Sequence, residues 1–454
     1  MKHPLMLASM LAFTSPIYAM SESETELPQV VEISSETTPS LESYRPLALS
    51  AKLKNVMAAV DMMESEIILI NADNDIIIQQ RLDSLAGWPG GRPQHVLISP
   101  NAKWLYVTID ASATHAANVV VIKVNDYAWN QGVADLEITK VLQAEPANTV
   151  STYNTPTQTS PEQPIASWTQ PAMTQLHGPT ILPYSKYVYF TQWSDNKVRV
   201  IDTKTQEFAS VDPIIIDDVT EQTHGVFFNK SGTLGLSTGY YYDDGDIDLF
   251  EVDKKTGALT LKKKIRLGDE HAYAAFTHFN TWIDERYAVT ASMQFGPTSN
   301  TPEGVGIIPP SIWMIDAWEG KAWPILGTAY YESDAGVLRS ASDVTVAAGK
   351  LYIAEEDSID DSYGDDGFIS IYDLSDKNNP TLIKRLAPGQ GLPADFSVSH
   401  GLGVTADQRF IYVSSYASKY ILKLDTQTDT IVKVYGAADG LTMPHGGFVS
   451  GATR

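Results

Sequence analysis

One strand pattern recurs seven times along this chain, and it limits the folds that the chain can adopt. In each copy a short apolar or alternating run ends in Asp or Asn, and a turn follows. The copies lie at residues 67–71, 119–125, 198–202, 247–253, 312–316, 369–373 and 421–425. The terminal side chain can accept a hydrogen bond from the backbone of the turn, which explains its place. Seven similar units predict a repeat architecture.

Other strand patterns flank each copy and complete a unit of four short strands. An apolar run containing tyrosine precedes several copies, as at 105–108, 188–191 and 411–414, and a fourth strand often follows, as at 259–265. Four-stranded units in series are the blades of a β-propeller. The sequence therefore predicts an all-β fold, a seven-bladed β-propeller that occupies residues 51–454.

The two ends of the repeat region complement each other. The last segment, 445–450, has the pattern of an innermost strand but no blade follows it, whereas the first unit begins near Lys54 without such a strand. If the last strand joins the first unit, the ring closes and no sheet edge is left exposed. The pattern therefore favours one closed domain over two smaller β-domains.

Histidine is rare, with nine residues in 454, yet it recurs where the inner strands of the units begin. The six candidates are His95, His177, His224, His271, His400 and His445. His278 lies within the inner strand of the fifth unit and can replace or supplement His271. Asp343 occupies the equivalent place in the sixth unit, and His115 falls in a loop. Because inner strands line the channel of a propeller, we expect these imidazoles to meet near one mouth.

A ring of imidazole nitrogens suits zinc or copper, so the six candidates are predicted to form a transition-metal site. Glycine after histidine in four units would let neighbouring backbones converge near the axis. Two alternatives stay open, since the same ring could bind an anionic small molecule or cofactor, or could only cap the strands. A metal-dependent enzyme is a further alternative, either a copper oxidoreductase or a lactonase-type hydrolase with Asp343, Glu221 and Glu270 as candidate carboxylates.

Acidic clusters and long insertions supply secondary candidates. Oxygen-rich loops can bind calcium, although neither cluster matches an EF-hand. The clusters consist of Asp243, Asp244, Asp246 and Asp248, and of Asp357, Asp360, Asp361, Asp365 and Asp366. The excursions at 145–175, 294–310 and 355–367 are candidate contact surfaces if the protein is an interaction scaffold.

Composition excludes several classes of function. The chain has 32 Lys and Arg against 55 Asp and Glu, which gives a formal net charge of −23 and argues against nucleic acid or anionic membranes as partners. The absence of cysteine excludes disulfides, thiolate nucleophiles and iron–sulfur clusters. The sequence also lacks a P-loop and a His-Glu-x-x-His motif.

The N-terminus has the pattern of a secretory signal peptide at residues 1–19, with a basic start, an apolar stretch and a small-residue end. Residues 20–50 are polar and acidic and are predicted to be disordered. No later segment reaches the length of a membrane span. We therefore expect a periplasmic or secreted protein without membrane insertion, whose partners are a metal ion and a periplasmic protein.

The strand pattern, with its segments at 105–108 and 411–414, resembles the YVTN-type seven-bladed propellers, a family that includes lactonase-like members. The histidine pattern is similar to the periplasmic zinc-chaperone propellers, in which histidines at inner-strand starts bind metal, and the His-Gly-Val segment at His224 carries this likeness. It is more distantly similar to the copper propeller of nitrous oxide reductase. These resemblances imply a metallochaperone or storage role. Residues 20–50 lack the histidine-rich segment that zinc chaperones usually carry.

Overall fold

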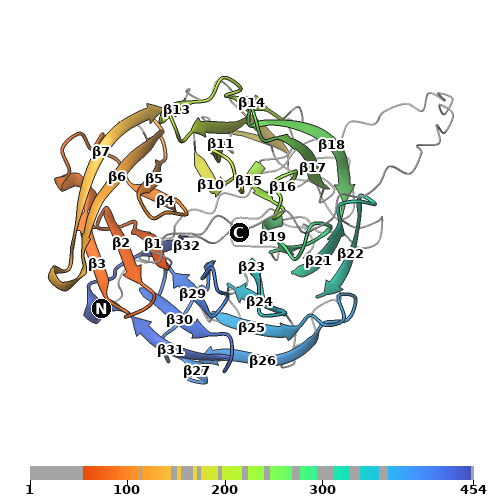
Figure 1. Cartoon of the computed structure of the whole chain (residues 1–454). Helices are drawn as coiled ribbons and strands as arrows, with labels where there is room; N and C mark the ends of the chain where they lie inside the picture. Colours follow the sequence, from red (N-terminus) through yellow and green to blue (C-terminus); the bar gives the residue numbers. More distant parts are fainter. Residues whose placement is uncertain are drawn as a thin grey trace, which may run out of the picture.

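The computed structural model describes residues 55–112, 115–144, 151–154, 167–170, 175–192, 197–216, 223–239, 246–267, 277–293, 310–327, 338–356 and 367–450. Seven antiparallel sheets stand around a central axis, one for each blade (Figure 1). The prediction of an all-β, seven-bladed propeller is confirmed. The described parts contain no helix long and apolar enough to cross a membrane.

In the first four blades, the strands succeed one another from the axis outward. The first blade contains β32 (Pro444–Val449), β1 (Val56–Asp61), β2 (Glu66–Asn71) and β3 (Ile77–Arg81). The second contains β4 (Pro93–Ile98), β5 (Trp104–Ile109), β6 (Asn118–Ala128) and β7 (Val133–Gln143). The third contains β10 (Leu176–Ile181), β11 (Tyr187–Gln192), β12 (Lys197–Asp202) and β13 (Glu207–Phe208), with β14 (Ile214–Ile215) also paired to β12. The fourth contains β15 (Thr223–Phe228), β16 (Leu234–Gly239), β17 (Asp246–Asp253) and β18 (Ala258–Arg266).

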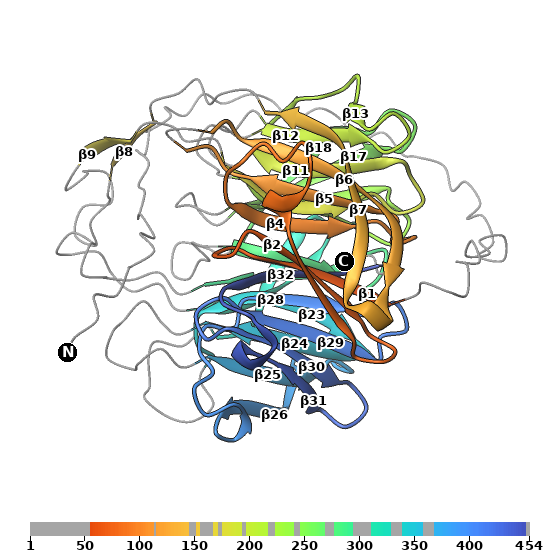
Figure 2. The same cartoon turned by 90° about the vertical axis from the view of Figure 1, so that its left-hand side faces the viewer.

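The last three blades follow the same order. The fifth contains β19 (Thr277–Trp282), β20 (Tyr287–Ser292), β21 (Ser311–Asp316) and β22 (Lys321–Leu326). The sixth contains β23 (Ala341–Ala347), β24 (Lys350–Glu355), β25 (Phe368–Asp373), β26 (Thr381–Pro388) and β27 (Gly391–Leu392). The seventh contains β28 (Gly401–Val404), β29 (Phe410–Ser415), β30 (Tyr420–Asp425) and β31 (Thr430–Tyr435). A separate hairpin of β8 (Ser151–Asn154) and β9 (Ser167–Gln170) lies beside the blades (Figure 2).

The seven Asp- or Asn-terminated patterns are the third strands of the seven blades, counted from the axis. Six of the seven terminal side chains accept hydrogen bonds from the turn that follows, as predicted, whereas the side chain of Asn125 donates to Glu137 at 3.5 Å. The carboxylate of Asp202 accepts from the N–H of Lys204 at 2.8 Å, and that of Asp425 accepts from the N–H of Gln427 at 2.8 Å. These bonds satisfy backbone donors where each blade turns outward.

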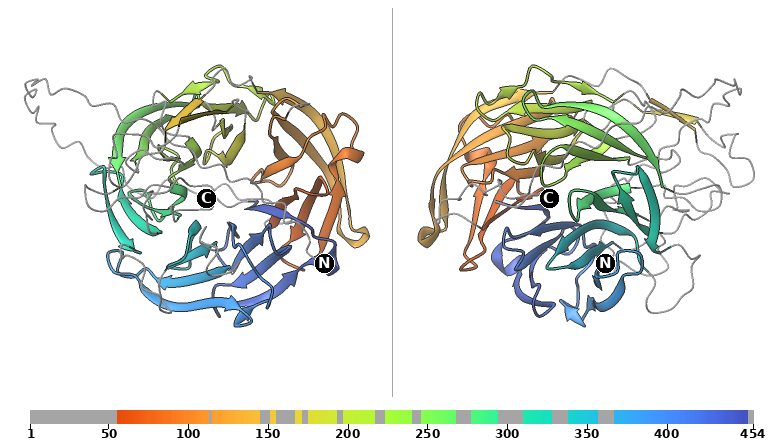
Figure 3. Two further views of the ribbon diagram at one scale, coloured as in Figure 1. Left: turned by 180° about the vertical axis from the view of Figure 1, so that it is seen from behind. Right: turned by 45° about the vertical axis from the view of Figure 1, so that its right-hand side comes forward.

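The ring closes because β32, the last strand, pairs antiparallel with β1 and becomes the innermost strand of the first blade. The C-terminal end of the described chain therefore lies near the centre of the ring (Figures 1 and 3). Val56 and Ser450 contact each other at one end of this pairing, where the Ser450 N–H donates to the Val56 carbonyl at 2.9 Å.

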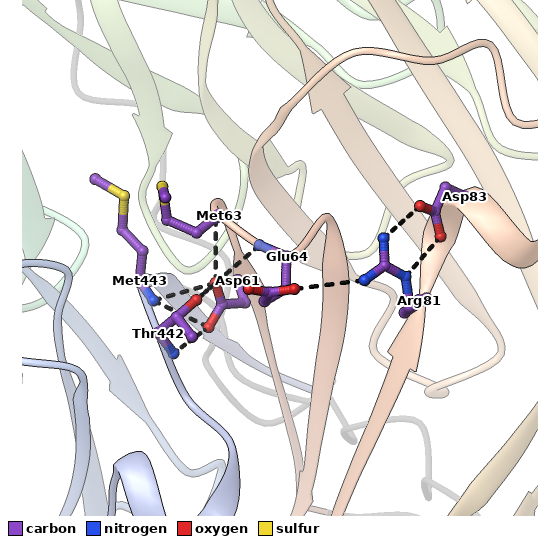
Figure 4. A network of polar contacts seen from close by, with 7 residues as sticks. All are labelled: Asp61, Met63, Glu64, Arg81, Asp83, Thr442 and Met443. Atoms are coloured by element: carbon purple, nitrogen blue, oxygen red, sulfur yellow. Dashed lines mark hydrogen bonds and ion pairs between the residues drawn. The ribbon is translucent and has the colours of Figure 1, made fainter.

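The side chain of Asp61 stabilises the other end of the pairing between β1 and β32 (Figure 4). Its carboxylate is fully buried and accepts hydrogen bonds from the Thr442 N–H and hydroxyl, each at 2.6 Å, and from the Met443 N–H at 3.0 Å. It also accepts from the Met63 N–H at 3.1 Å, so one side chain joins both ends of the chain. Hydrogen bonds to a charged acceptor contribute more than neutral ones.

Replacing Asp61 with alanine is expected to destabilise the propeller, because the N–H and hydroxyl groups that donate to this carboxylate lose their acceptor. We expect a loss of about 3 kcal/mol in the free energy of unfolding. Urea unfolding followed by circular dichroism would measure it. Asp73→Ala is the control, since Asp73 is an exposed turn aspartate of the same blade. An equal, small effect of both substitutions would show that Asp61 does not hold the closure.

Several sequence-based predictions lie outside the described residues. These are the signal peptide at 1–19, the segment 20–50, most of the excursion at 145–175, residues 294–309 and residues 357–366. The carboxylates of Glu221 and Glu270 and the aspartates at 243–244 fall in the same class. They remain predictions.

Candidate functional site: a ring of histidines at the propeller axis

Six histidines from six blades stand where the inner strands begin. They are His445 in β32, His95 in β4, His177 in β10, His224 in β15, His278 in β19 and His400 just before β28. Inner strands converge on the axis of a propeller, so residues that are far apart in the sequence meet there. We call these six side chains the histidine ring.

The six imidazoles form a closed circuit, each lying against the next. The distances between ring centroids are 4.6 Å for His445–His95, 4.8 Å for His95–His177, 4.8 Å for His177–His224, 4.3 Å for His224–His278, 5.1 Å for His278–His400 and 4.8 Å for His400–His445. These separations place neighbouring rings in van der Waals contact. The side chains therefore surround the axis as one continuous layer.

Five of the six candidates named from the sequence lie in this ring, and the fifth blade supplies a different histidine. His278 is the second residue of the inner strand β19 and takes that blade's place, whereas His271 lies outside the described residues. His115 stands apart in a loop, where its Nδ1 contacts the hydroxyl of Ser112 at 3.2 Å.

The sixth blade contributes no histidine, and Asp343 has a different contact pattern from the one expected of a ligand. Its carboxylate accepts from the N–H of Val344 at 2.8 Å and from the N–H of Leu402 at 2.7 Å. These bonds tie β23 to the neighbouring strand β28. Asp343 is therefore engaged in holding two inner strands together.

The carboxylate that reaches the ring from the sixth blade is Glu356, which the sequence reasoning did not single out. It is buried, directly follows β24, and contacts Nδ1 of His400. Tyr416 directly follows β29 in the next blade, and its ring centroid lies 5.1 Å from that of His400. Both are the first residue after the second strand of a blade. This shared position in the repeat could have identified both residues from the sequence, because the second strand of a blade ends beside the histidine at the start of the inner strand.

Hydrogen bonds fix the tautomers of two ring members. Nδ1 of His278 lies 2.6 Å from the carbonyl oxygen of Ser342, and Nδ1 of His445 lies 2.6 Å from that of Gln94. A carbonyl oxygen only accepts, so both Nδ1 atoms carry the proton and donate it. In the neutral imidazole, Nε2 then holds the lone pair. Metal-binding histidines are usually oriented by such a bond from the second nitrogen.

Burial keeps five of the six ring histidines uncharged. Desolvation lowers the pKa of His95, His224, His278 and His445 well below the usual 6.5, and it lowers that of His177 to about 3. Neighbouring imidazoles lower these pKa values further, because a second positive charge nearby is unfavourable. At neutral pH these five histidines are neutral and can offer lone pairs.

His95 and His177 are joined directly. Nε2 of His95 lies 2.9 Å from Nδ1 of His177, so one nitrogen donates its proton to the other. If His177 donates, its own Nε2 is a lone pair; if His95 donates, His177 is protonated at Nε2. The tautomers of these two histidines therefore decide which nitrogen is available to a ligand.

Of the four glycines that follow a ring histidine, Gly178 allows the expected close approach of neighbouring blades, whereas a Cβ at Gly446 would meet nothing within 4 Å. A Cβ at Gly178, which has a φ of +51°, would lie 2.2 Å from the carbonyl oxygen of His224. A second close approach lies at Gly403, three residues after His400, where a Cβ would lie 2.0 Å from the carbonyl oxygen of Gly447. In both places only hydrogen fits between the inner strands of adjacent blades.

Gly178→Ala is expected to destabilise the fold by about 3 kcal/mol and to displace His177, because the methyl group meets backbone rather than a movable side chain. Thermal unfolding would measure the loss. Gly132→Ala is the matched control, since Gly132 also has a positive φ of +67° but open space around it. If both variants lose the same stability, backbone strain alone explains the effect and the close approach contributes nothing.

Beyond the histidine layer, the inner strands line a small apolar cavity. Its walls include Leu97, Ile181, Leu402 and Phe448, each a few residues after a ring histidine in its strand. An ion would have to lose its hydration shell to pass this region, which is costly.

The histidine ring fits a transition metal in its chemistry. It offers neutral imidazoles, with Nδ1 of His278 and His445 donating to carbonyl oxygens and a carboxylate beside His400. In the described part of the chain, no three His, Asp or Glu side chains already stand in the arrangement that holds one ion. A bound ion would therefore require neighbouring imidazoles to turn toward it.

The calcium sites expected at the acidic clusters lie largely outside the described residues. Asp246 and Asp248 are described and belong to β17, and Asp248 is fully buried. The second cluster, at 357–366, is not described. Calcium binding at these loops stays a prediction.

Comparison with known proteins supports the fold. No protein-family model matches this chain, and neither does the sequence of any curated protein.

Three solved structures illustrate the likeness. A functionally unknown protein from Desulfotomaculum acetoxidans has a TM-score of 0.57 at 12% identity, covering 87% of this chain and 98% of its own. The periplasmic gluconolactonase of Pseudomonas aeruginosa has a TM-score of 0.54 at 9% identity, covering 88% and 99%. A hypothetical selenium-binding protein from Sulfolobus tokodaii has a TM-score of 0.54 at 14% identity, covering 89% and 95%.

At these identities the likeness establishes the propeller fold and nothing finer. The chain is similar to lactonase-like propellers in architecture, as the sequence resemblance implied. The resemblance to the YVTN family and that to zinc-chaperone propellers remain predictions, because no match to either supports them.

Proposed function

We propose that this protein is a metal-binding propeller that handles zinc or copper through the histidine ring, in a metallochaperone or storage role. The observation that carries the proposal is the closed circuit of six imidazoles, with neighbouring centroids 4.3 to 5.1 Å apart. A single buried histidine is usually structural. Six that converge from six blades on one axis indicate a shared ligand.

The chemistry of the ring favours a soft or borderline cation. Neutral nitrogen donors suit zinc and copper better than calcium or magnesium, which prefer oxygen. The imidazoles pack against one another around the axis, which favours an ion over an organic substrate. This supports binding and transfer over the alternatives of a lactonase-type hydrolase or a copper oxidoreductase.

The proposed location is the periplasm or the outside of the cell. It rests on the signal-peptide pattern at residues 1–19 and on the high negative charge of the chain. A partner protein that donates or accepts the metal is part of the proposed role. Fractionation of cells that produce the untagged protein would test the location.

Metal content tests the function. The mature protein would be purified without an affinity tag and its metals counted by plasma mass spectrometry, beside a His400→Ala/His445→Ala double variant. We expect zinc or copper in the parent and little in the double variant. His115→Ala is the control, because this histidine lies outside the ring, and it should keep its metal. A parent protein without metal, even after reconstitution with zinc and with copper, would overturn the proposal.

Removing the carboxylate beside His400 tests the same site more finely. Glu356→Gln is expected to weaken metal binding about 10- to 100-fold, the usual effect of losing a carboxylate that orients a histidine ligand. Competition with a chromophoric chelator would measure the affinity. Asp343→Asn provides a comparison, since that carboxylate bonds backbone N–H groups instead. An unchanged affinity in the Glu356 variant would show that His400 is not a ligand.

A further inference from the structure

If the six imidazole centroids lie at the corners of a planar hexagon, the histidine ring is too wide for a single ion at its centre to bind opposite members. An imidazole that binds zinc through nitrogen places its ring centre roughly 3.2 Å from the ion, so two ligands of one ion have centroids at most about 6.4 Å apart. The centroids of neighbouring imidazoles in the circuit lie between 4.3 and 5.1 Å apart. A planar hexagon with sides of about 4.7 Å has opposite corners about 9.4 Å apart, which exceeds that limit by about 3 Å.

Neighbouring imidazoles, in contrast, are well spaced to share an ion. Two ligands of one tetrahedral zinc have ring centroids roughly 5.2 Å apart, and adjacent members of the ring are only slightly closer. An ion would therefore lie between neighbours, off the axis. A circuit of six then has room for a second ion on its far side.

The two halves of the ring are not equivalent. In the first half, His278, His400 and His445, each Nδ1 faces an oxygen acceptor, either a carbonyl or the carboxylate of Glu356. The second half consists of His95, His177 and His224, and two of its members bond to each other, Nε2 of His95 to Nδ1 of His177. The first half thus has its tautomers set for binding, and the second must break an internal hydrogen bond.

We propose, on the basis of the metal-binding function above, that the histidine ring takes up two metal ions at two distinct sites, one in each half. The first half fills first, because hydrogen bonds to oxygen acceptors already set its tautomers and Glu356 makes His400 a better donor. The second half fills more weakly, because binding there requires the His95–His177 hydrogen bond to break. In both halves the imidazoles turn inward to complete the site.

The test is a titration of metal-free protein with Zn²⁺, followed by calorimetry and by native mass spectrometry. The parent is expected to bind two equivalents in two resolved steps. His400→Ala should lose the tighter step and His177→Ala the weaker one, each keeping one equivalent. His115→Ala should behave as the parent. If an alanine variant does not fold, glutamine at the same position keeps a polar side chain of similar reach.

The outcomes separate the two proposals. If the parent binds one equivalent, and either variant abolishes it, the ring holds one shared ion and the two-site proposal is overturned while metal binding stands. If the parent binds no zinc and, in a parallel titration, no Cu⁺, both proposals fail. Two equivalents that both survive in the His400 and His177 variants would place the ions elsewhere in the protein and would overturn the proposal as well.

Discussion

Metal-free protein is expected to lose most of its stability when the pH falls from 7.5 to 5.5. Five ring histidines have folded-state pKa values lowered by burial, whereas in the unfolded chain they titrate near 6.5. Below pH 6.5 the unfolded chain therefore binds more protons than the folded one. Stability is complete above that pH and declines as the pH falls toward the folded-state values.

The expected size of this loss is large. Each such histidine costs about 1.4 kcal/mol for one pH unit below 6.5, so five cost on the order of 7 kcal/mol at pH 5.5. A typical domain has a total stability of about 5–15 kcal/mol. The unfolding midpoint in urea, measured in a chelating buffer at half-unit steps of pH, would record the decline.

Two controls make this result specific to the ring. His445→Gln removes one titrating group and should reduce the slope by about one proton, whereas His115→Gln should not change it. Saturation with metal should flatten the curve, because an ion competes with protons for the same lone pairs. Stability that stays constant from pH 7.5 to 5 would show that the imidazoles are not desolvated as the structure has them.

A chain that ends at residue 443 is expected not to fold into a stable propeller. It lacks β32, so the first blade loses its innermost strand, the edge of β1 is exposed, and Phe448 and Val449 leave the core. The lost burial and hydrogen bonds amount to on the order of 5–10 kcal/mol, which is comparable to the whole stability of a domain. Circular dichroism and urea unfolding would show the loss, together with a tendency to aggregate through the open edge.

Addition of a peptide spanning residues 444–454 provides the complementary measurement. The peptide should restore a cooperative unfolding transition, and the same peptide with His445 replaced by Ala should restore the fold without restoring full metal binding. A chain that ends at residue 450 is the length control, since Ser450 pairs with Val56 at the end of the closure. A stable, monomeric chain ending at 443 would contradict this account of closure.

The fold could be predicted in detail because its signals are local and repeated. The seven Asp- or Asn-terminated strands are identifiable from alternation and turn chemistry, and all are third strands of blades. Closure by the last strand follows from the number of strands at the two ends. Each of these inferences needs only the neighbouring residues, and repetition then fixes the architecture.

The site could be predicted only in part, because the sequence of a single repeat does not determine the contacts between neighbouring blades. Five ring histidines share a common position in the repeat. In the fifth repeat the sequence offers two histidines close together, and His271 was chosen as the metal-ligand candidate ahead of His278. Glu356 belongs, by sequence, to the start of an acidic loop. Its contact with His400 depends on how the sixth and seventh blades pack against each other, and the spacing of residues in the sequence does not predict that packing.

The histidine ring combines residues from the first and last parts of the sequence. Nδ1 of His445 donates to the carbonyl of Gln94, which lies 351 residues earlier in the chain. A ribosome must therefore finish almost the entire polypeptide before the circuit can exist. An incomplete or unfolded chain presents only scattered histidines, which bind metals far more weakly than a converged set. If the histidine ring binds metal as proposed, the order of synthesis would delay binding until folding is complete, so that the metal would come from whatever pool surrounds the finished molecule.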